Sequence, residues 1–246
     1  MSSWNLLIIG GSAHLVNLDS DVIEIPGFGS FPGKAIKNQK IGSEFNLFGE
    51  KSLIVEYSMS DLQSNIRRGP QIILPKDIAW MIHKSGLKSG DTAIEAGTGS
   101  AALTLSLAQT VAPNGKVITF ENNPKHSRIA EKNLNMSPWK DLVNINKTEL
   151  GDNTEKIRAD AIFLDLPNPD QIVSWAERSL KVGGFMLIYV PTSNQIEKLL
   201  NSLGDWKQIE IVEVIQREWQ ARIEALRPKS SMIGHTGFIV SARWNG

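Results

Sequence analysis

The chain of 246 residues contains no cysteine, carries no formal net charge and has no long apolar segment. Without cysteine it forms no disulfide and no thiolate metal site, so we expect a reducing, cytoplasmic setting. A membrane-spanning helix needs about 18 consecutive apolar residues, and no segment approaches that length, so we expect no membrane partner. The first residues, MSSWNLLIIGG, lack the basic start of a signal peptide. No His and acidic residues cluster with ligand spacing, so the sequence predicts no metal site.

The balanced charge gives no global attraction to a polyanion, since 26 basic residues face 26 acidic ones. A nucleic acid would therefore have to bind local clusters, of which two stand out. The first contains Arg67, Arg68, Lys76, His83, Lys84 and Lys88, and the second contains Arg217, Arg222, Arg227 and Lys229. For each residue taken alone, a solvated surface role is the simpler explanation.

The pattern of the chain changes near residue 58. Residues 1–58 contain short β-like runs (NLLII, DVIEI, SLIVEY) separated by glycine and proline turns, which predicts a small β-barrel or sandwich. Residues 59–246 alternate between apolar strands and helices, which predicts a doubly wound parallel sheet of the Rossmann-like α/β class. The expected strands are Thr92–Ala96, Lys116–Glu121, Leu142–Asn146, Asp160–Asp165 and Phe185–Val190. Two final runs, QIEIVEVIQREW and HTGFIVSARW, have no helix between them, so we expect an antiparallel pair at one edge.

The stretch TAIEAGTGSAALTLSLA predicts a strand, a Gly-x-Gly turn and a helix. Gly97 and Gly99 permit positive φ and close approach of a ligand, and Glu121 ends the next strand, where it can bind both hydroxyls of a ribose. This arrangement fits either a dinucleotide or S-adenosylmethionine (AdoMet). A pyrophosphate disfavours an acid beside the glycines, whereas the ammonium and sulfonium of AdoMet favour one, so Glu95 favours AdoMet. A tight turn without a ligand is the alternative.

Asp165 ends the predicted strand ADAIFLD, and Pro167 and Pro169 after it stop strand pairing and stiffen the exit. Ligands of open α/β sheets lie beyond the carboxyl ends of the strands, which places Asp165 opposite Gly97 and the methyl donor. A ring nitrogen such as adenine N1 needs no deprotonation before it is methylated. A fixed carboxylate would stabilise the positive charge that develops on the exocyclic amine. Alternatively, Asp165 merely complements the N-terminus of the next helix.

Several motifs follow one another along the chain: RRGPQIILPKD, EAGTGS, LDLPNP, REW with Arg222 three residues on, LRP and GHTGF. Together they resemble the tRNA (adenine-N1)-methyltransferases that modify a T-loop adenosine, in the homo-oligomeric form of archaea and bacteria. The resemblance covers essentially the whole chain. It implies AdoMet-dependent methylation of adenine N1 at tRNA position 58, with position 57 as a further target. It also implies a small N-terminal β-domain, a methyltransferase domain and a tetramer of identical subunits.

The resemblance further implies roles for single residues. Asp165 is expected to receive the amino group of the target adenine, and Glu121 to hold the AdoMet ribose. Other AdoMet contacts are expected from Ile73, Glu95, Gly97, Thr98, Gly99, Ser100 and Asp165, with Glu149 or Asp152 beside the adenine ring. Contacts with tRNA are expected from Lys76, Arg217, Arg222, Arg227 and His235. Trp219 either stacks on a base or packs into the core.

Several positions depart from the family pattern, among them two near the expected site. Leu74 stands where the family often has an aromatic residue that packs on the target base, and Ala101 replaces a second loop glycine. These changes motivate an alternative function, a non-catalytic tRNA-binding subunit that pairs with an active partner, although the chain keeps its AdoMet motif. A nicotinamide-dependent oxidoreductase is a further alternative. Glu95 and the lack of an obvious hydride-transfer acid argue against it.

Overall fold

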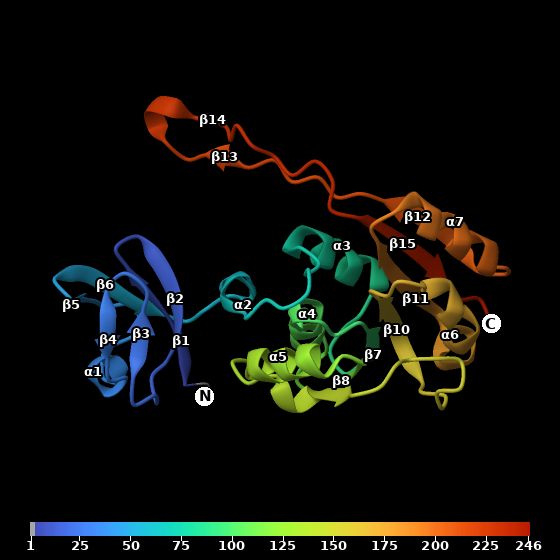
Figure 1. The fold of residues 1–246 in the computed structure, drawn as a ribbon, viewed down its shortest axis with the longest axis horizontal. Helices are drawn as coiled ribbons and strands as arrows, with labels where there is room; N and C mark the ends of the chain where they lie inside the picture. Colours follow the sequence, from blue (N-terminus) through green and yellow to red (C-terminus); the bar gives the residue numbers. More distant parts are fainter. Residues whose placement is uncertain (1–2) are drawn as a thin grey trace.

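The computed structural model describes residues 3–246, and Figure 1 shows a small β-rich region joined by an extended link to a larger α/β region. The β-rich region has one antiparallel sheet of order β2-β1-β6-β5 and a separate β3-β4 hairpin. Its elements are β1 (Trp4–Ile9), β2 (Ser12–Asn17), β3 (Ile23–Ile25), β4 (Gly29–Phe31), α1 (Lys34–Lys37), β5 (Glu44–Leu47) and β6 (Glu50–Val55). Leu7, Ile9 and Ile54 belong to its own buried apolar core. The division into two domains at residue 58 stays a prediction, because a domain is a unit that folds independently.

The link to the α/β region begins with α2 (Met59–Asn65). Ser58 and Asp61 form a reciprocal capping box that satisfies the free N–H groups of its first turn. On its buried face, the Gln63 amide donates hydrogen bonds to the Ala102 carbonyl oxygen (2.9 Å) and to Ser106 Oγ (2.8 Å). These bonds fix the link on the α/β region.

The larger region is built on a seven-stranded sheet of order β12-β15-β11-β10-β7-β8-β9. Strands β11, β10, β7, β8 and β9 pair in parallel, and β15 pairs antiparallel with both β11 and β12. The strands are β7 (Thr92–Ala96), β8 (Lys116–Phe120), β9 (Val143–Asn146), β10 (Ala159–Leu164), β11 (Leu180–Val190), β12 (Lys207–Val212) and β15 (Phe238–Arg243). The helices are α3 (Pro75–Ser85), α4 (Ala102–Val111), α5 (Pro124–Leu134), α6 (Val173–Ser179) and α7 (Ser193–Ser202), with short 3-10 turns at Lys140–Leu142, Pro169–Ile172 and Ile223–Ala225. The Rossmann-like α/β prediction is confirmed.

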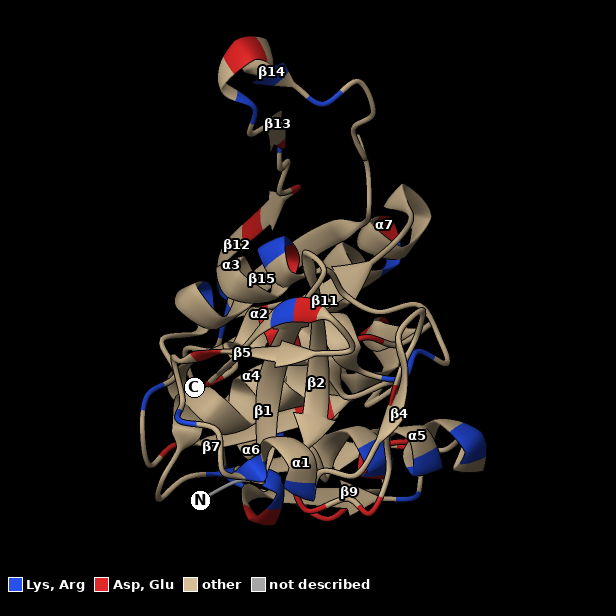
Figure 2. Ribbon diagram, turned by 90° about the vertical axis from the view of Figure 1, so that its left-hand side faces the viewer, with Lys and Arg blue, Asp and Glu red and all other residues tan. Residues whose placement is uncertain are grey.

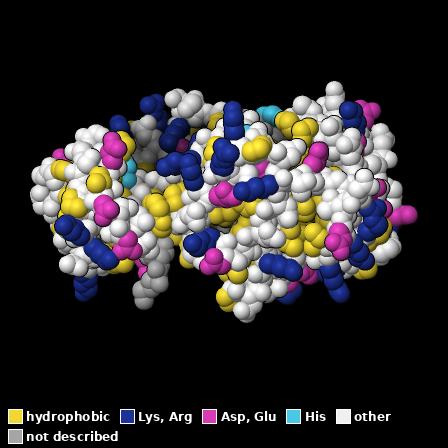
Figure 3. Space-filling view, turned by 60° about the horizontal axis from the view of Figure 1, so that its bottom comes forward, with side chains coloured by type: hydrophobic (Ala, Val, Ile, Leu, Met, Phe, Trp, Pro, Cys, Tyr) yellow, Lys and Arg dark blue, Asp and Glu magenta, His cyan; other side chains and the backbone are white. Residues whose placement is uncertain are grey.

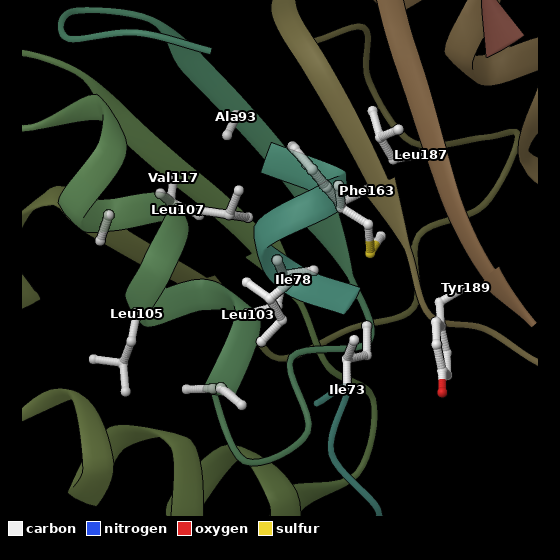
Figure 4. Close-up of a cluster of buried hydrophobic side chains, with 14 of the residues drawn as sticks. Ile73, Ile78, Ala93, Leu103, Leu105, Leu107, Val117, Phe163, Leu187 and Tyr189 are labelled. Carbon is white, nitrogen blue, oxygen red and sulfur yellow. The ribbon is translucent and has the colours of Figure 1, made fainter. Parts of the chain in front are cut away.

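Each face of this sheet carries its own apolar core, because side chains alternate along a strand. On β10, Phe163 packs with residues of α3 and α4, whereas Ile162 and Leu164 pack with residues of α6 and α7 on the other face. Figure 4 shows the first core, in which Ile78, Leu103 and Phe163 are among the labelled side chains. Tyr189 lies at its border, with the hydroxyl at the end of the ring away from Leu187 (Figure 4).

The expected strands are confirmed to within a residue at their carboxyl ends, and the two final runs do form the antiparallel pair β12 and β15. Between them the chain leaves the sheet as a long projecting arm, residues 213–237, whose outer part pairs β13 (Trp219–Gln220) with β14 (Arg227–Pro228). Figures 1 and 2 both show the arm extending far from the α/β region. No helix within residues 3–246 is long and apolar enough to cross a membrane. The same residues place no cluster of three or more His, Asp or Glu where it could hold a metal ion.

Candidate active site

Three neighbouring parallel strands end at the same edge of the sheet and bring together residues far apart in sequence. Gly97 follows β7, Glu121 follows β8 and Asp165 follows β10. Strand β7 lies between the other two, at the point where the chain order reverses. Open α/β sheets bind ligands in this position, beyond the carboxyl ends of the strands. The structure therefore unites the three residues that the sequence singled out.

The backbones of Gly97 and Asp165 lie in direct contact. Gly97 has φ +96°, and a Cβ atom added there would lie 2.2 Å from the Asp165 carbonyl oxygen. The Asp165 N–H donates to the Ala96 carbonyl oxygen at 2.9 Å. Only glycine fits this approach without strain, so the glycine loop and the acid form one rigid unit.

Glu121 holds the glycine loop from the neighbouring strand end. Its Oε2 accepts a hydrogen bond from the Gly99 N–H (2.9 Å), and its Oε1 accepts one from the Asn123 N–H (2.9 Å). His126 Nδ1 lies 3.7 Å from the same Oε1. The carboxylate thus lies beside the loop, where the ribose of a nucleotide is expected.

Burial, and after it the negative charge of Glu121, raises the pKa of Asp165 to about 6. A nearby cation lowers the pKa of Asp165 and stabilises its ionised form, so the site favours a cationic ligand. The positive φ of Gly97 and Gly99 opens the backbone to close approach. These residues fit a methyl donor that carries a sulfonium and an ammonium, and they disfavour the pyrophosphate of a dinucleotide.

Glu95 lies behind the loop, where its side chain is buried. Its Oε2 accepts hydrogen bonds from Thr119 Oγ1 (2.6 Å) and Thr104 Oγ1 (2.7 Å), and Thr119 also bonds Thr98 Oγ1 (2.6 Å). Burial raises the pKa of Glu95 to about 8, although both threonine bonds act to lower it. Glu95 is therefore protonated near pH 7 and supports the loop through Thr98. The negative charge that the sequence argument assigned to it belongs to Asp165 and Glu121, and its contact with AdoMet stays a prediction.

We expect Glu95→Gln to remove a pH dependence of stability. Between the ordinary pKa of 4.5 and the folded value of about 8, the folded state holds a proton that the unfolded state has released. Stability of the wild type therefore falls as pH rises through this window, by at most about 1.4 kcal/mol per pH unit. Denaturant unfolding at pH 5 and pH 8 should show Glu95→Gln more stable than wild type by roughly 2–4 kcal/mol at pH 8 only. The exposed control Glu155→Gln should show the same dependence of stability on pH as the wild type. If Glu95→Gln also shows the wild-type dependence, Glu95 is ionised in the folded state.

The RRGP segment, residues 67–70, packs against the glycine loop. The Gly69 N–H donates to Ser100 Oγ at 3.1 Å, and a Cβ on Gly99 would lie 3.2 Å from Pro70 Cγ. Ile73, an expected AdoMet contact, is 4% exposed and belongs to the adjoining apolar core. Thr98 and Ser100 are also buried. The AdoMet contacts of these residues stay predictions.

Asn133 is a site residue that the sequence reasoning missed. It is fully buried on α5, and its side chain accepts from the Arg67 N–H (2.9 Å) and donates to the carbonyl oxygens of Arg67 (2.9 Å) and Ser100 (2.9 Å). Asn133 thereby joins the RRGP segment to the glycine loop. The spacing of residues in α5 could have indicated this role. Ser127, Ala130, Asn133 and Leu134 recur at helical spacing and form the buried face of the helix. A large polar residue in that stripe indicates a buried hydrogen-bonding role.

The ammonium group of Lys76, an expected tRNA contact, is already paired with other residues of the chain. Its Nζ binds both carboxylate oxygens of the buried Asp77 (2.8 and 2.9 Å) and Thr236 Oγ1 (2.8 Å). Its side chain is 9% exposed, so it fastens α3 to the root of the arm. Beside it, Leu74 borders a recess of about 330 Å³ formed with arm residues such as Met232 and Ile233. The tRNA contact of Lys76 stays a prediction.

The remaining expected tRNA contacts lie on the arm. Arg217, Arg222 and Arg227 are exposed there, and Trp219 is 55% exposed, so its packing into the core is excluded. Because the arm pairs with itself and projects outward (Figure 1), these residues lie away from Asp165 of their own chain. Their contacts with tRNA stay predictions. His235, at the root, pairs with Glu213, whose hydrogen bond raises the pKa of the imidazole.

The two candidates for the adenine ring differ in their surroundings. Asp152 Oδ1 binds Arg178 at 2.8 Å and is drawn toward α6. Glu149 is exposed and has no ion pair among the residues that the structure describes. The structure therefore leaves Glu149 as the better candidate, still as a prediction.

Comparison with known proteins places the chain in a family. The family model for the tRNA methyltransferase complex GCD14 subunit matches residues 62–236. The tRNA (adenine(57)-N(1)/adenine(58)-N(1))-methyltransferase TrmI of Methanocaldococcus jannaschii is 34% identical over 224 residues, covering 79% of each chain. The tRNA (adenine(58)-N(1))-methyltransferase TrmI of Thermus thermophilus is 29% identical over 87% of this chain and 86% of its own.

Two solved structures share the whole fold. A SAM-dependent O-methyltransferase of Thermotoga maritima superposes with a TM-score of 0.88 at 28% identity, covering 100% of this chain and 94% of its own. The tRNA (m1A58) methyltransferase TrmI of Aquifex aeolicus gives a TM-score of 0.79 at 24% identity, covering 98% and 96%. The family match and the M. jannaschii relative confirm the resemblance expected from the motifs: the chain belongs to the family of the tRNA methyltransferase complex GCD14 subunit.

Proposed function

We propose that the chain transfers a methyl group from AdoMet to N1 of an adenine in the T-loop of tRNA, at position 58 and, as in the M. jannaschii relative, also at 57. One observation carries the proposal. Asp165 lies at the carboxyl end of β10 with its backbone held against Gly97, next to the loop expected to hold the cofactor. A carboxylate fixed there faces the place where an accepting base must meet the donor.

The residues of the site match the needs of this reaction. AdoMet, when bound, supplies an electrophilic methyl group on a sulfonium. Asp165, with a pKa of about 6, is ionised near neutral pH and can accept a hydrogen bond from the adenine amino group. That bond strengthens as positive charge develops on the ring, so it stabilises the transition state more than the ground state. Because N1 carries a free lone pair, no side chain has to remove a proton before the attack.

The same geometry bears on the non-catalytic alternative. A subunit that only binds tRNA has no need of the Gly97–Asp165 contact or of Glu121 on the Gly99 N–H. The chain retains both. Purified protein that turns over tRNA alone would exclude the alternative, and a requirement for a second, different subunit would support it.

The direct test is incubation with methyl-labelled AdoMet and total tRNA, followed by nucleoside analysis. We expect 1-methyladenosine that maps to the T-loop. The nucleoside analysis also separates this product from a 2′-O-methylated nucleoside, which matters because the T. maritima structural neighbour is named as an O-methyltransferase. Label in ribose, or no label in tRNA, would contradict the proposal.

We also propose that the chain assembles as a tetramer of identical subunits through the arm. Large apolar side chains on the arm are exposed, and in solution they favour burial against another copy. They are Ile215, Trp219, Ile223, Leu226, Met232 and Ile233. Such an assembly would also bring the arginines of one arm toward another subunit.

We expect Ile223→Asp combined with Leu226→Asp to weaken assembly at least about tenfold, since both side chains lose apolar contact and bring charge into the interface. Light scattering coupled to size-exclusion chromatography would show a smaller mass at micromolar concentration. Val182→Asp, at an equally exposed apolar residue of β11 (70% exposed), is the matched control and should keep the wild-type mass. An unchanged mass in the double variant would contradict assembly through the arm.

A further inference from the structure

Half of the first basic cluster in the sequence is neutralised in the folded chain. Lys76 binds the buried Asp77, Lys84 binds Glu210 and Lys88 binds Asp91. Of the other three members, Arg67 and Arg68 carry a permanent charge; both are exposed, and neither forms an ion pair within residues 3–246. In this cluster, the positive charges that are available to a partner are therefore those of the two arginines.

The backbone of the two arginines lies against α5. Asn133 of that helix binds both the N–H and the carbonyl oxygen of Arg67, each at 2.9 Å. A Cβ on Gly69 would lie 2.6 Å from Ile129 Cδ1 and 3.9 Å from His126 Cδ2, so the segment runs along the helix. Arg67 and Arg68 are thus set beside the exposed face of α5.

That exposed face carries three more cations. Lys125, Arg128 and Lys132 have the spacing i, i+3, i+7, which places them on one stripe of a helix. All three are exposed and, in the part of the chain that the structure describes, form no ion pair with an acidic side chain. Glu131 of the same helix pairs instead with Lys147 at 2.6 Å. Figure 2 shows Lys and Arg positions recurring along α5. Figure 3, which brings the lower side of Figure 1 forward, shows Lys and Arg side chains across the middle of that face.

The chemistry of this face favours a charged partner over an apolar one. Among the described residues, large exposed apolar side chains occur up to Phe48 and again from Val182 onward, with none in the stretch that contains α5. A protein interface needs an apolar centre, whereas an RNA backbone needs cations. The face also borders the active site, since Glu121 bonds the Asn123 N–H at the start of α5 and Ser100 accepts from Gly69.

We propose that Arg67, Arg68, Lys125, Arg128 and Lys132 form one surface that binds the phosphate backbone of the RNA substrate beside the methyl-transfer site. The proposal rests on the proposed function and names the part of the chain that holds the tRNA. Phosphate contacts of this kind set the register of a nucleic acid and carry no sequence information. The surface therefore governs affinity and its salt dependence, while Asp165 acts on the base.

The test compares two triple variants with equal loss of charge. Lys125→Gln, Arg128→Gln and Lys132→Gln remove the stripe of α5, and Lys156→Gln, Arg158→Gln and Lys198→Gln remove exposed cations away from it. Each released phosphate contact lowers the slope of log affinity against log salt by about 0.7–0.9. We expect the first variant to lose about two units of slope and roughly tenfold or more in tRNA affinity at low salt. Its affinity for AdoMet, measured by calorimetry, should match the wild type, and the second variant should keep the wild-type slope.

Three results would overturn the proposal: an unchanged slope in the first variant, an equal loss in the control, or a changed mass in light scattering. The last would mean that the face contacts another copy of the chain. Failure of the proposed function looks different, because then the wild type itself would not methylate tRNA. If the wild type methylates tRNA and the α5 variant binds it equally well, the surface alone is refuted.

Discussion

Asp165→Asn is expected to lower kcat for methylation of tRNA by about 10²–10³-fold, the usual loss when one preorganised electrostatic contact to a developing charge is removed. The asparagine keeps the size of the side chain and an oxygen that accepts a hydrogen bond, but it removes the negative charge. AdoMet affinity should fall less than about tenfold, because Glu121 and the glycine loop remain in place. Single-turnover rates at saturating AdoMet, together with calorimetric binding, separate the two effects.

A pH profile tests the same assignment independently. Burial and the charge of Glu121 raise the pKa of Asp165 to about 6, and the ionised form is the active one. Wild-type activity should therefore fall as pH drops through about 6, or through a lower value when the cationic donor is bound. Asp165→Asn should lack this inflection, while Asp170→Asn, in the following turn, should keep both the rate and the inflection. Methylation by Asp165→Asn at the wild-type rate would contradict the proposal that the charge of Asp165 stabilises the transition state.

Much of the fold was predictable because the signals are local. The parallel strands are short apolar runs bounded by turns, and Ile162 and Phe163 can be assigned to opposite faces from alternation alone. The meeting of Gly97, Glu121 and Asp165 was also predictable, since carboxyl ends of parallel strands share one edge. The replacement of a family glycine by Ala101 has a structural consequence. Ala101 adopts φ +63° at the start of α4, a backbone conformation that glycine adopts more readily than alanine.

The environment of each acid was not predictable, because it depends on partners from other elements. Glu95 is neutralised by burial beside Thr104 of α4 and Thr119 of β8, residues that no spacing rule links to it. The arm escaped prediction for the opposite reason. Its residues have few tertiary partners, and the sequence pattern does not show whether they fold back or project. The pairing of Lys76 with Asp77 and Thr236 is likewise a contact between distant segments.

Gly97→Ala is expected to disrupt both stability and catalysis, because it attacks the contact that joins the glycine loop to the acid. The new methyl group would meet the Asp165 carbonyl oxygen at 2.2 Å and the Asp165 carbonyl carbon at 3.0 Å, both backbone atoms that cannot rotate away. Overpacking costs about 1–3 kcal/mol, and an L side chain at φ +96° adds about 1–3 kcal/mol of backbone strain. We therefore expect the free energy of unfolding to fall by about 2–6 kcal/mol in denaturant titrations.

The glycine at position 204 provides the matched control, since a Cβ there meets nothing within 4 Å and the backbone has no positive φ. Gly204→Ala should leave stability unchanged or raise it by up to about 1 kcal/mol through the unfolded state. In the fraction of Gly97→Ala that folds, relief of the clash must move Asp165 away from β7. A displacement of about 1 Å is enough to lower kcat about 100-fold. If Gly97→Ala instead folded stably and methylated tRNA at the wild-type rate, the backbone contact would have no part in positioning Asp165, and the rigid placement of its charge could not be the source of catalysis.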